Sequence, residues 1–249
     1  MTSRTSLSPS PSPPIRACLF DMDGLLINSE EIYTAVVNQV LAEHGKGPLP
    51  WAIKAELQGL PGPFAAKRLI EWSNLPYTPD ELFAKTSGLQ KQLWSNTRPM
   101  PGAHELLKYL VSKNVPIALA SSSHTHNYNL KTAHLQDMFS LFTKHKVLGD
   151  DPRIPLGRGK PAPDIWLVAL DSLNADIENE QDHIKPEECL VFEDGIPGVV
   201  GAKAAGSQVI WIPDPRILNE FEHKKHEIIG EYGEILSSLE DLDFVKYSL

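Results

Sequence analysis

The sequence predicts an α/β fold: a parallel sheet with helices on both faces and an inserted domain made only of helices. Short apolar runs of strand length at 17–20, 117–120 and 189–192 each end abruptly in polar residues. Uninterrupted apolar runs are typical of strands buried on both faces of a parallel sheet. Between the first two runs, about seventy-five residues show helical spacing and no strand pattern. We therefore expect the helices to be inserted directly after the first strand.

The first apolar run, Ala17 to Phe20, is followed by Asp21, Asp23 and Gly24. Parallel sheets hold their ligands at the carboxyl ends of the strands, where these side chains would project. Two crowded carboxylates repel each other, and their hard oxygen atoms suit Mg²⁺. An acidic turn without chemistry is the alternative, and the Asp-x-Asp spacing alone does not decide between the two.

The second run is predicted to be a strand over 115–120 that ends at Ser121, Ser122 and Ser123. A hydroxyl and successive backbone N–H groups at a strand-to-helix turn can hold a phosphate, since a helix N-terminus favours anions. A simple helix cap is the alternative. His124 and His126 follow two residues apart and would point to different sides of a helix, so we exclude a zinc site. His134 joins them as a surface or lid-facing residue.

Two further stretches carry charged residues next to a predicted helix or strand. Lys160 precedes a helix that starts near Pro161 and has Asp164 in its first turn, and Glu193 and Asp194 end the run 189–192. Taken alone, Lys160 is predicted to be a solvated lysine, and the nearby Arg158 could take its place in a charged site.

In this order the four motifs resemble those of the haloacid dehalogenase (HAD) superfamily. The resemblance implies a Rossmann-like core, phosphoryl transfer through an aspartyl-phosphate, and Mg²⁺ as cofactor. It implies the catalytic residues Asp21, Asp23, Ser121 and Lys160, with Lys160 neutralising the charge of the aspartate and of the phosphate together. It implies a metal site formed by Asp21, Asp23 and Asp194 with Glu193. Around it we expect substrate contacts from Gly24, Ser29, Gly59, Ser122, Ser123 and His124.

Over residues 15–245 the chain resembles the pseudouridine-5'-phosphatase branch, through its segments at 100–103, 118–123, 139–142, 147–152 and 189–195. This implies hydrolysis of a small phosphomonoester, with pseudouridine 5'-phosphate as the best candidate. Glycerol-phosphate and sugar-phosphate phosphatases are the alternative. A β-phosphoglucomutase-like mutase needs a cationic anchor in its cap, and the loop 59–63 has no Arg or Lys. A non-catalytic HAD-like binding protein would be expected to lose Asp21, Asp23 or Lys160.

We predict three parts: a disordered Ser/Pro-rich tail at 1–14, an α/β core at 15–27 and 100–249, and a helical cap at 28–99. Helices are expected from Asn28 to His44, at 52–57 and 63–72, and from Thr78 to 94, with Asn28 and Thr78 as capping residues. A cap placed there would lie over the site as a lid, and a bundle without a gating role is the alternative.

The rest of the core is predicted from the same patterns. A polar run at 141–148 suggests an edge strand. A helix follows Pro163, and another has Pro197 near its start and Gly206 just past its end. The fifth strand is expected at 208–212. We see no chemistry in the charged segment beyond 220.

Composition excludes several classes. There are 23 basic and 32 acidic residues, a net charge of −9, which disfavours nucleic-acid and anionic-membrane partners. No apolar run approaches the ~18 residues of a transmembrane helix. Cys18 and Cys189 lie inside apolar runs and read as buried thiols in a reducing compartment. We expect a cytoplasmic monomer whose partner is a small-molecule substrate.

Overall fold

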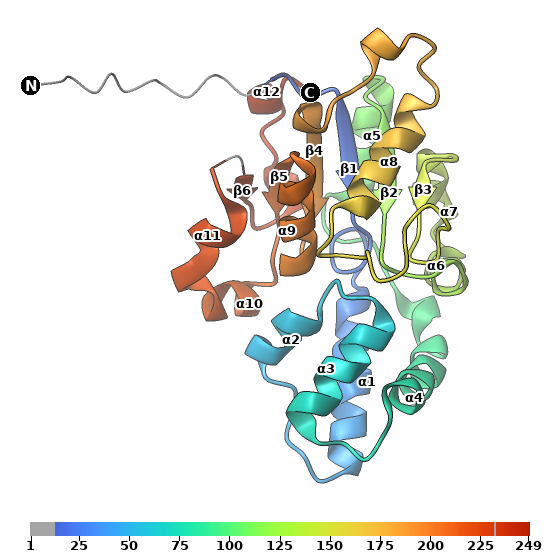
Figure 1. Ribbon diagram of the computed structural model, residues 1–249, viewed down its shortest axis with the longest axis vertical. Helices are drawn as coiled ribbons and strands as arrows, with labels where there is room; N and C mark the ends of the chain where they lie inside the picture. Colours follow the sequence, from blue (N-terminus) through green and yellow to red (C-terminus); the bar gives the residue numbers. More distant parts are fainter. Residues whose placement is uncertain (1–12, 232) are drawn as a thin grey trace, which may run out of the picture.

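The computed structural model describes residues 13–231 and 233–249, so most of the predicted tail lies outside the described residues. Its centre is a six-stranded parallel sheet with strand order β3-β2-β1-β4-β5-β6 (Figure 1). The strands are β1 (Ala17–Phe20), β2 (Ile117–Ala120), β3 (Lys146–Val147), β4 (Cys189–Glu193), β5 (Gln208–Trp211) and β6 (Gly233–Ile235). Strand order reverses between β1 and β4, and open parallel sheets bind ligands beyond the carboxyl ends at such a point.

Alternate residues of β1 serve the two faces of the sheet. Cys18 and Phe20 pack into one hydrophobic cluster, and Ala17 and Leu19 pack into the other, as the two-residue period of a strand requires. The first cluster includes residues of α5 (Ala103–Ser112), α6 (Thr125–Thr132), α7 (Gln136–Phe139) and α12 (Phe244–Tyr247). The second includes residues of α8 (Asp164–Asn174), α9 (Ile196–Ala205) and α11 (Lys225–Ile229). Helices therefore cover both faces, as predicted.

An aromatic stack joins the two central strands near their carboxyl ends. The rings of Phe20 on β1 and Phe192 on β4 are 4.6 Å apart between centroids, with an interplanar angle of 4°. Phe20 directly precedes Asp21, and Phe192 directly precedes Glu193. The stack thus supports both strand ends that carry carboxylates.

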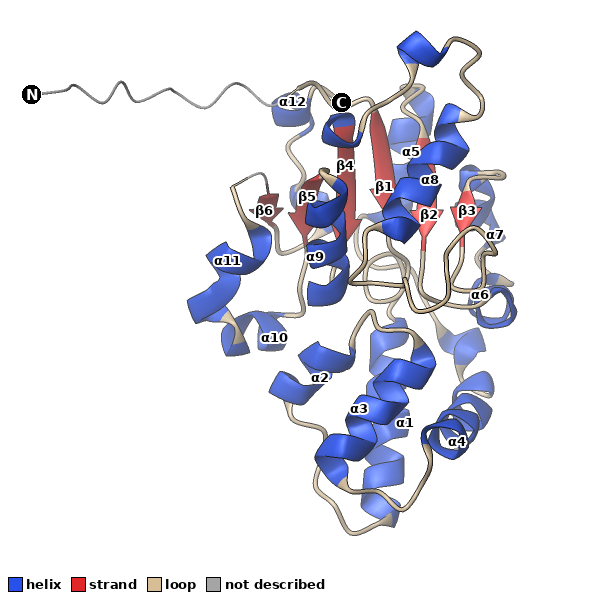
Figure 2. Cartoon of the chain, viewed as in Figure 1, coloured by secondary structure: helices blue, strands red, loops and turns tan. Residues whose placement is uncertain are grey.

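Four α-helices lie between β1 and α5 in the chain, and Figure 2 shows them beyond the arrowheads of the strands. They are α1 (Ser29–Glu43), α2 (Trp51–Leu57), α3 (Gly62–Ser73) and α4 (Pro79–Lys91). We call residues 28–99 the helical insertion. It has its own apolar cluster, which includes Val40, Leu69 and Leu82. The insertion therefore packs as a unit across the carboxyl ends of the sheet.

Both capping predictions can be compared with the structure. Thr78 and Glu81 form the predicted capping box at the start of α4. At α1 the side-chain cap is absent, because the Asn28 Oδ1 atom instead accepts a hydrogen bond from the backbone N–H of Arg98 at 2.8 Å. Asn28 ties the two connections between the insertion and the core together, and the prediction of its capping role was wrong.

The predicted strand at 141–148 was largely wrong. Only Lys146–Val147 pairs with β2, at the edge of the sheet, and Ser140–Phe142 forms a 3-10 turn. Phe139 and Phe142, three residues apart, are both fully buried, so helical spacing determines this segment rather than strand alternation. The sixth strand was not predicted, because its three residues are only partly buried.

The remaining elements are short. They are α10 (Pro215–Glu220) and the 3-10 turns η1 (Trp94–Asn96), η2 (Ser140–Phe142), η3 (Glu180–Asp182), η4 (Pro186–Glu188), η5 (Glu222–Lys224) and η6 (Leu239–Asp241). Cys18 and Cys189 are free, buried thiols, as predicted, and burial raises the pKa of each. Within the described part of the chain, every helix is too short or too polar to cross a membrane.

Candidate active site

The central strands bring the predicted residues to one edge of the sheet. Asp21 follows β1, Ser121 follows β2, and Asp194 follows β4, and β1 pairs directly with both β2 and β4. All three side chains are buried. Residues as far apart in the chain as Asp21 and Asp194 therefore meet where the strand order reverses.

Three carboxylates converge at this edge. Oxygen atoms of Asp21, Glu193 and Asp194 all lie within 4.8 Å of one another. Burial, with the nearby Glu193 and Asp23 charges, raises the pKa of Asp21 to about 8 although Lys160 opposes the shift. Burial, Glu193 and Asp21 raise the pKa of Asp194 well above its usual value. The cluster holds more negative charge than its surroundings balance, which suits a hard divalent cation.

The two oxygens of Glu193 are already engaged. One accepts a hydrogen bond from Lys160 Nζ at 2.7 Å, and the other accepts one from the backbone N–H of Gly195 at 2.7 Å. Asp21 and Asp194 are thus the carboxylates best suited to hold Mg²⁺ directly, and Glu193 supports Lys160. Glu193 was predicted as a metal ligand, and its contacts favour this supporting position.

Lys160 is fully buried beside the first aspartate. Its Nζ lies 2.5 Å from Asp21 Oδ1 and 4.5 Å from the centroid of the Trp166 ring. Arg158, the alternative considered from the sequence, instead pairs with Asp164 at 2.8 Å on the surface. The structure therefore brings Lys160, and not Arg158, to the strand ends.

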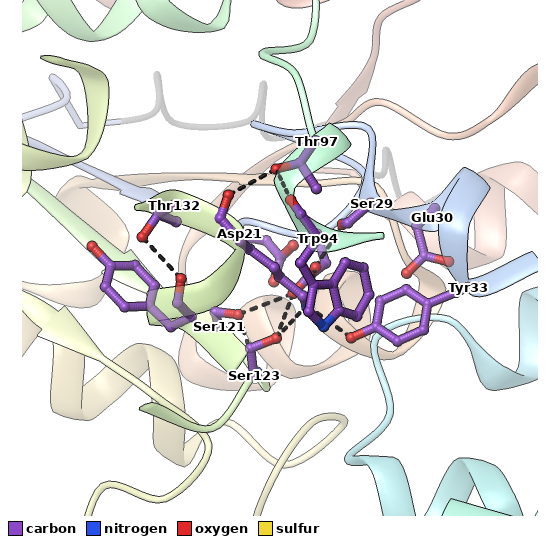
Figure 3. A network of polar contacts seen from close by, with 12 residues as sticks. Asp21, Ser29, Glu30, Tyr33, Trp94, Thr97, Ser121, Ser123 and Thr132 are labelled. Carbon is purple, nitrogen blue, oxygen red and sulfur yellow. Dashed lines mark hydrogen bonds and ion pairs between the residues drawn. The ribbon is translucent and has the colours of Figure 1, made fainter. Parts of the chain in front are cut away.

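Asp23 is held by a network of polar groups, of which Figure 3 labels Ser29, Ser121 and Ser123. Its carboxylate accepts hydrogen bonds from Ser29 Oγ at 2.5 Å, Ser123 Oγ at 2.7 Å, Lys131 Nζ at 2.5 Å and Ser121 Oγ at 3.4 Å. Burial acts to raise the pKa of Asp23, but Lys131 and the hydroxyl donors outweigh it, so the pKa lies below its usual value. The side chain of Asp23 is outside the converging carboxylates, so of the metal contact predicted at this residue only the backbone carbonyl remains.

Sequence reasoning missed Lys131. It is fully buried on α6, 108 residues from Asp23 in the chain. A single lysine in a polar helix is usually solvated, so no local pattern distinguished it from a surface residue.

A cavity of about 350 Å³ opens from the strand ends into the helical insertion. Asp21 and Asp23 line it, together with the predicted contacts Gly59, Ser122, Ser123 and His124. Ser122 Oγ donates a 3.0 Å hydrogen bond to the Gly59 carbonyl, so core and insertion meet at the cavity wall.

Two predicted substrate contacts, Gly24 and Ser29, are not among the residues that line this cavity. Ser29 is fully buried and donates to Asp23. Gly24 has φ +90°, and a Cβ there would overlap the Asp194 carboxylate and contact Glu30 Cγ at 2.8 Å. Gly24 is therefore suited to the close approach of Asp194, and Ser29 to the orientation of Asp23.

The insertion contributes two more polar groups that the sequence did not indicate. Gln58 Nε2 donates to Asp194, whereas Gln58 Oε1 is buried and has no partner among the described residues. Lys54 of α2 also reaches the cavity, where it forms an ion pair with Glu30. The part of the insertion that lines the cavity therefore carries a cation, Lys54, whose charge is balanced by Glu30.

The sequence and fold also match known proteins. A profile of haloacid dehalogenase-like hydrolases matches residues 15–206. The chain belongs to this family. Its six-stranded core is the Rossmann-like fold predicted from the motifs.

Relatives of this HAD-like hydrolase carry phosphatase names. It is 52% identical over 238 residues to a probable pseudouridine-5'-phosphatase of Saccharomyces cerevisiae, an alignment covering 94% of this chain and 98% of the relative. It is 37% identical over 201 residues to a (DL)-glycerol-3-phosphatase of Arabidopsis thaliana, covering 80% of each. The enzyme is a phosphatase.

A solved structure supports the same fold. A HAD family hydrolase from Deinococcus radiodurans, crystallised with bound phosphate and sodium, is 27% identical, with a TM-score of 0.67. The match covers 93% of this chain and 95% of that one.

Proposed function

We propose that this phosphatase hydrolyses the phosphomonoester of a small metabolite through an aspartyl-phosphate on Asp21. The observation that carries the proposal is the buried Asp21 carboxylate, which lines the cavity, pairs with Lys160 and belongs to the cluster of three carboxylates. A carboxylate so placed can act as a nucleophile.

The chemistry follows in two steps. An oxygen of Asp21 bonds to phosphorus as the bond to the leaving oxygen breaks, and Asp23 gives that oxygen a proton. Water then attacks phosphorus and gives a proton to Asp23, and the bond to Asp21 breaks to release phosphate. Asp23 is ionised in the ligand-free protein because its pKa is low, and the charge of a bound phosphoryl group favours the protonated form that the first step requires.

The remaining groups would offset negative charge. Lys160 balances Asp21 and the phosphoryl oxygens, and Ser121 donates a hydrogen bond to one of them. Mg²⁺, held by Asp21, Asp194 and the Asp23 carbonyl, would supply positive charge to the equatorial oxygens. Residues 28–99 form a cap that closes over the cavity and excludes water.

The size and lining of the cavity favour a substrate larger than glycerol phosphate. About 350 Å³ falls within the range of pockets for drug-sized ligands. On α4, Gln90 is buried in the cavity wall, and Ser87 Oγ is buried without a partner among the described residues. Such groups can bind a heterocycle by hydrogen bonds, and with the Saccharomyces relative they support pseudouridine 5'-phosphate as substrate.

The alternatives are less well supported. Glycerol phosphate would fill only part of the cavity, although the Arabidopsis relative keeps it as the second candidate. A mutase needs a free cation in the cap for a second phosphate, and Lys54 is paired with Glu30.

The test is phosphate release from a panel of pseudouridine 5'-phosphate, uridine 5'-phosphate, glycerol 3-phosphate and glucose 1-phosphate, with and without Mg²⁺. We expect Mg²⁺-dependent turnover, with kcat/KM for pseudouridine 5'-phosphate at least about tenfold above that for glycerol 3-phosphate. Faster turnover of glycerol 3-phosphate would replace the substrate assignment, and no turnover of any ester would contradict the proposed function.

A further inference from the structure

We propose that Lys131 is a positioning residue that holds the Asp23 carboxylate in place for attack by water on the aspartyl-phosphate. The inference rests on the proposed function, since it takes Asp23 as the proton carrier. Asp23 lines the cavity and Lys131 does not, so a substrate in the cavity would contact Asp23 but not Lys131. Lys131 therefore acts through Asp23.

The ammonium group of Lys131 is bound on all sides. It lies 2.5 Å from Asp23 Oδ1, 2.7 Å from Ser123 Oγ and 2.8 Å from the Tyr33 hydroxyl. An ammonium has three N–H donors, and each has an oxygen within reach. With its side chain fully buried, Lys131 has one favourable position, and that position fixes one oxygen of Asp23.

Aromatic rings complete the site from the insertion. Lys131 Nζ lies 4.8 Å from the ring centroid of Tyr33 and 4.6 Å from that of Trp94, distances at which a cation is attracted to a ring face. Thr97 Oγ1 also donates to the Lys131 carbonyl at 2.7 Å. The lysine is thus held from both parts of the chain, by Ser123 of the core and by three residues of the insertion. Figure 3 labels these four partners, Ser123, Tyr33, Trp94 and Thr97.

Among the described residues, Lys131 is the cation that forms an ion pair with Asp23. Without Lys131 it keeps hydroxyl contacts from Ser29 and Ser123 but loses its ion pair. The ion pair between Lys160 and Asp21 uses different atoms and stays intact. Loss of Lys131 should therefore impair the step that depends on Asp23 and spare the attack by Asp21.

Pre-steady-state kinetics with p-nitrophenyl phosphate and Mg²⁺ separates the two steps. Nitrophenolate leaves without a proton, so attack by Asp21 needs no acid, whereas water attack needs Asp23 as base. For Lys131→Met we expect a burst of about one nitrophenolate per active site, followed by turnover about 10²-fold below wild type. Lys131→Arg keeps the charge and should recover at least about tenfold of the lost turnover.

The control is Lys246→Met. Lys246 makes the same kinds of contact at the C-terminal end, an ion pair with Glu234 at 2.7 Å and a ring contact with Tyr247 at 5.2 Å, and its loss should leave turnover unchanged. Should Lys131→Met fail to fold in a thermal melt, Tyr33→Phe removes one contact to Nζ and keeps the ring. It should show the same burst with a fall of several-fold.

Loss of the burst together with turnover in Lys131→Met, or unchanged turnover, would overturn the inference. Either result leaves the proposed function standing as long as wild type turns over and Asp21→Asn gives neither burst nor turnover. A wild-type enzyme without turnover would instead contradict the proposed function itself.

Discussion

Two buried lysines face two aspartates at the same edge of the sheet, and their surroundings differ in charge balance. Lys160 contacts Asp21 beside two further carboxylates, and the pKa of Asp21 rises to about 8. Lys131 contacts Asp23 among hydroxyls and aromatic rings, and the pKa of Asp23 falls. A lysine paired with an aspartate thus leaves excess negative charge around Asp21, which suits a bound cation, whereas the charge around Asp23 is balanced. Neighbouring charge, and not the lysine, determines which carboxylate suits a metal.

The largest expected effect comes from the nucleophile. Asp21→Asn replaces the attacking carboxylate with an amide, and turnover should fall by about 10⁴-fold or more. Burst kinetics with p-nitrophenyl phosphate measure this directly. If Asp21→Asn still gave a burst, the nucleophile would be another residue, and the proposed difference between the Lys160 and Lys131 sites would not hold.

Removal of Mg²⁺ tests the charge balance. Because the folded pKa of Asp21 lies above its unfolded value, the metal-free protein binds more protons folded than unfolded between about pH 4 and pH 8, and its stability falls as pH rises through that window. Mg²⁺ must displace this proton, so the rise in Tm on adding Mg²⁺ should grow from pH 6 to pH 8. Thermal melts with EDTA or Mg²⁺ check this, and Asp21→Asn should weaken the trend. A trend of the same size in Asp21→Asn would contradict the explanation.

The comparison of the two lysine sites implies that both lysines act on the phosphoryl group and that neither selects the rest of the substrate. Selection of the leaving group would then lie on α4, where Gln90 is 6% exposed in the cavity wall. Gln90→Leu should raise KM for pseudouridine 5'-phosphate by about tenfold, the value of one good hydrogen bond. kcat/KM for p-nitrophenyl phosphate should change less than twofold. Equal losses on both substrates would show damage to the cavity rather than lost selection.

The smallest effect is expected far from both lysines. Thr78→Ala removes the hydroxyl that caps α4 and should cost about 1 kcal/mol of stability. Urea unfolding measures the loss, and kcat should be unchanged. A large fall in kcat would mean that the insertion transmits small changes to the strand ends.

The sequence allowed prediction of what is local. The apolar runs ending at Asp21, Ser121 and Asp194 marked the central strands, and Thr78 with Glu81 marked the start of α4. The order of the motifs then predicted that Lys160 lies at the same edge of the sheet, where it contacts Asp21.

What escaped prediction depends on contacts between distant segments. Gln58 and Asp194 are 136 residues apart, and Lys131 and Tyr33 are 98 apart. Whether a glutamine or a lysine is buried is decided by the element packed against it, and a single polar residue carries no periodic signal of its burial. The edge strand failed for a related reason, since Phe139 and Phe142 are buried at helical spacing.

The stack of Phe20 on Phe192 has a practical consequence for mutational surveys. Each ring is one peptide bond away from a carboxylate of the site. A smaller side chain at either position would leave a void in the closely packed interior, and the neighbouring strand end would shift to fill it. A screen that measures only loss of turnover would therefore class these two hydrophobic residues with the catalytic residues, although neither one contacts the substrate.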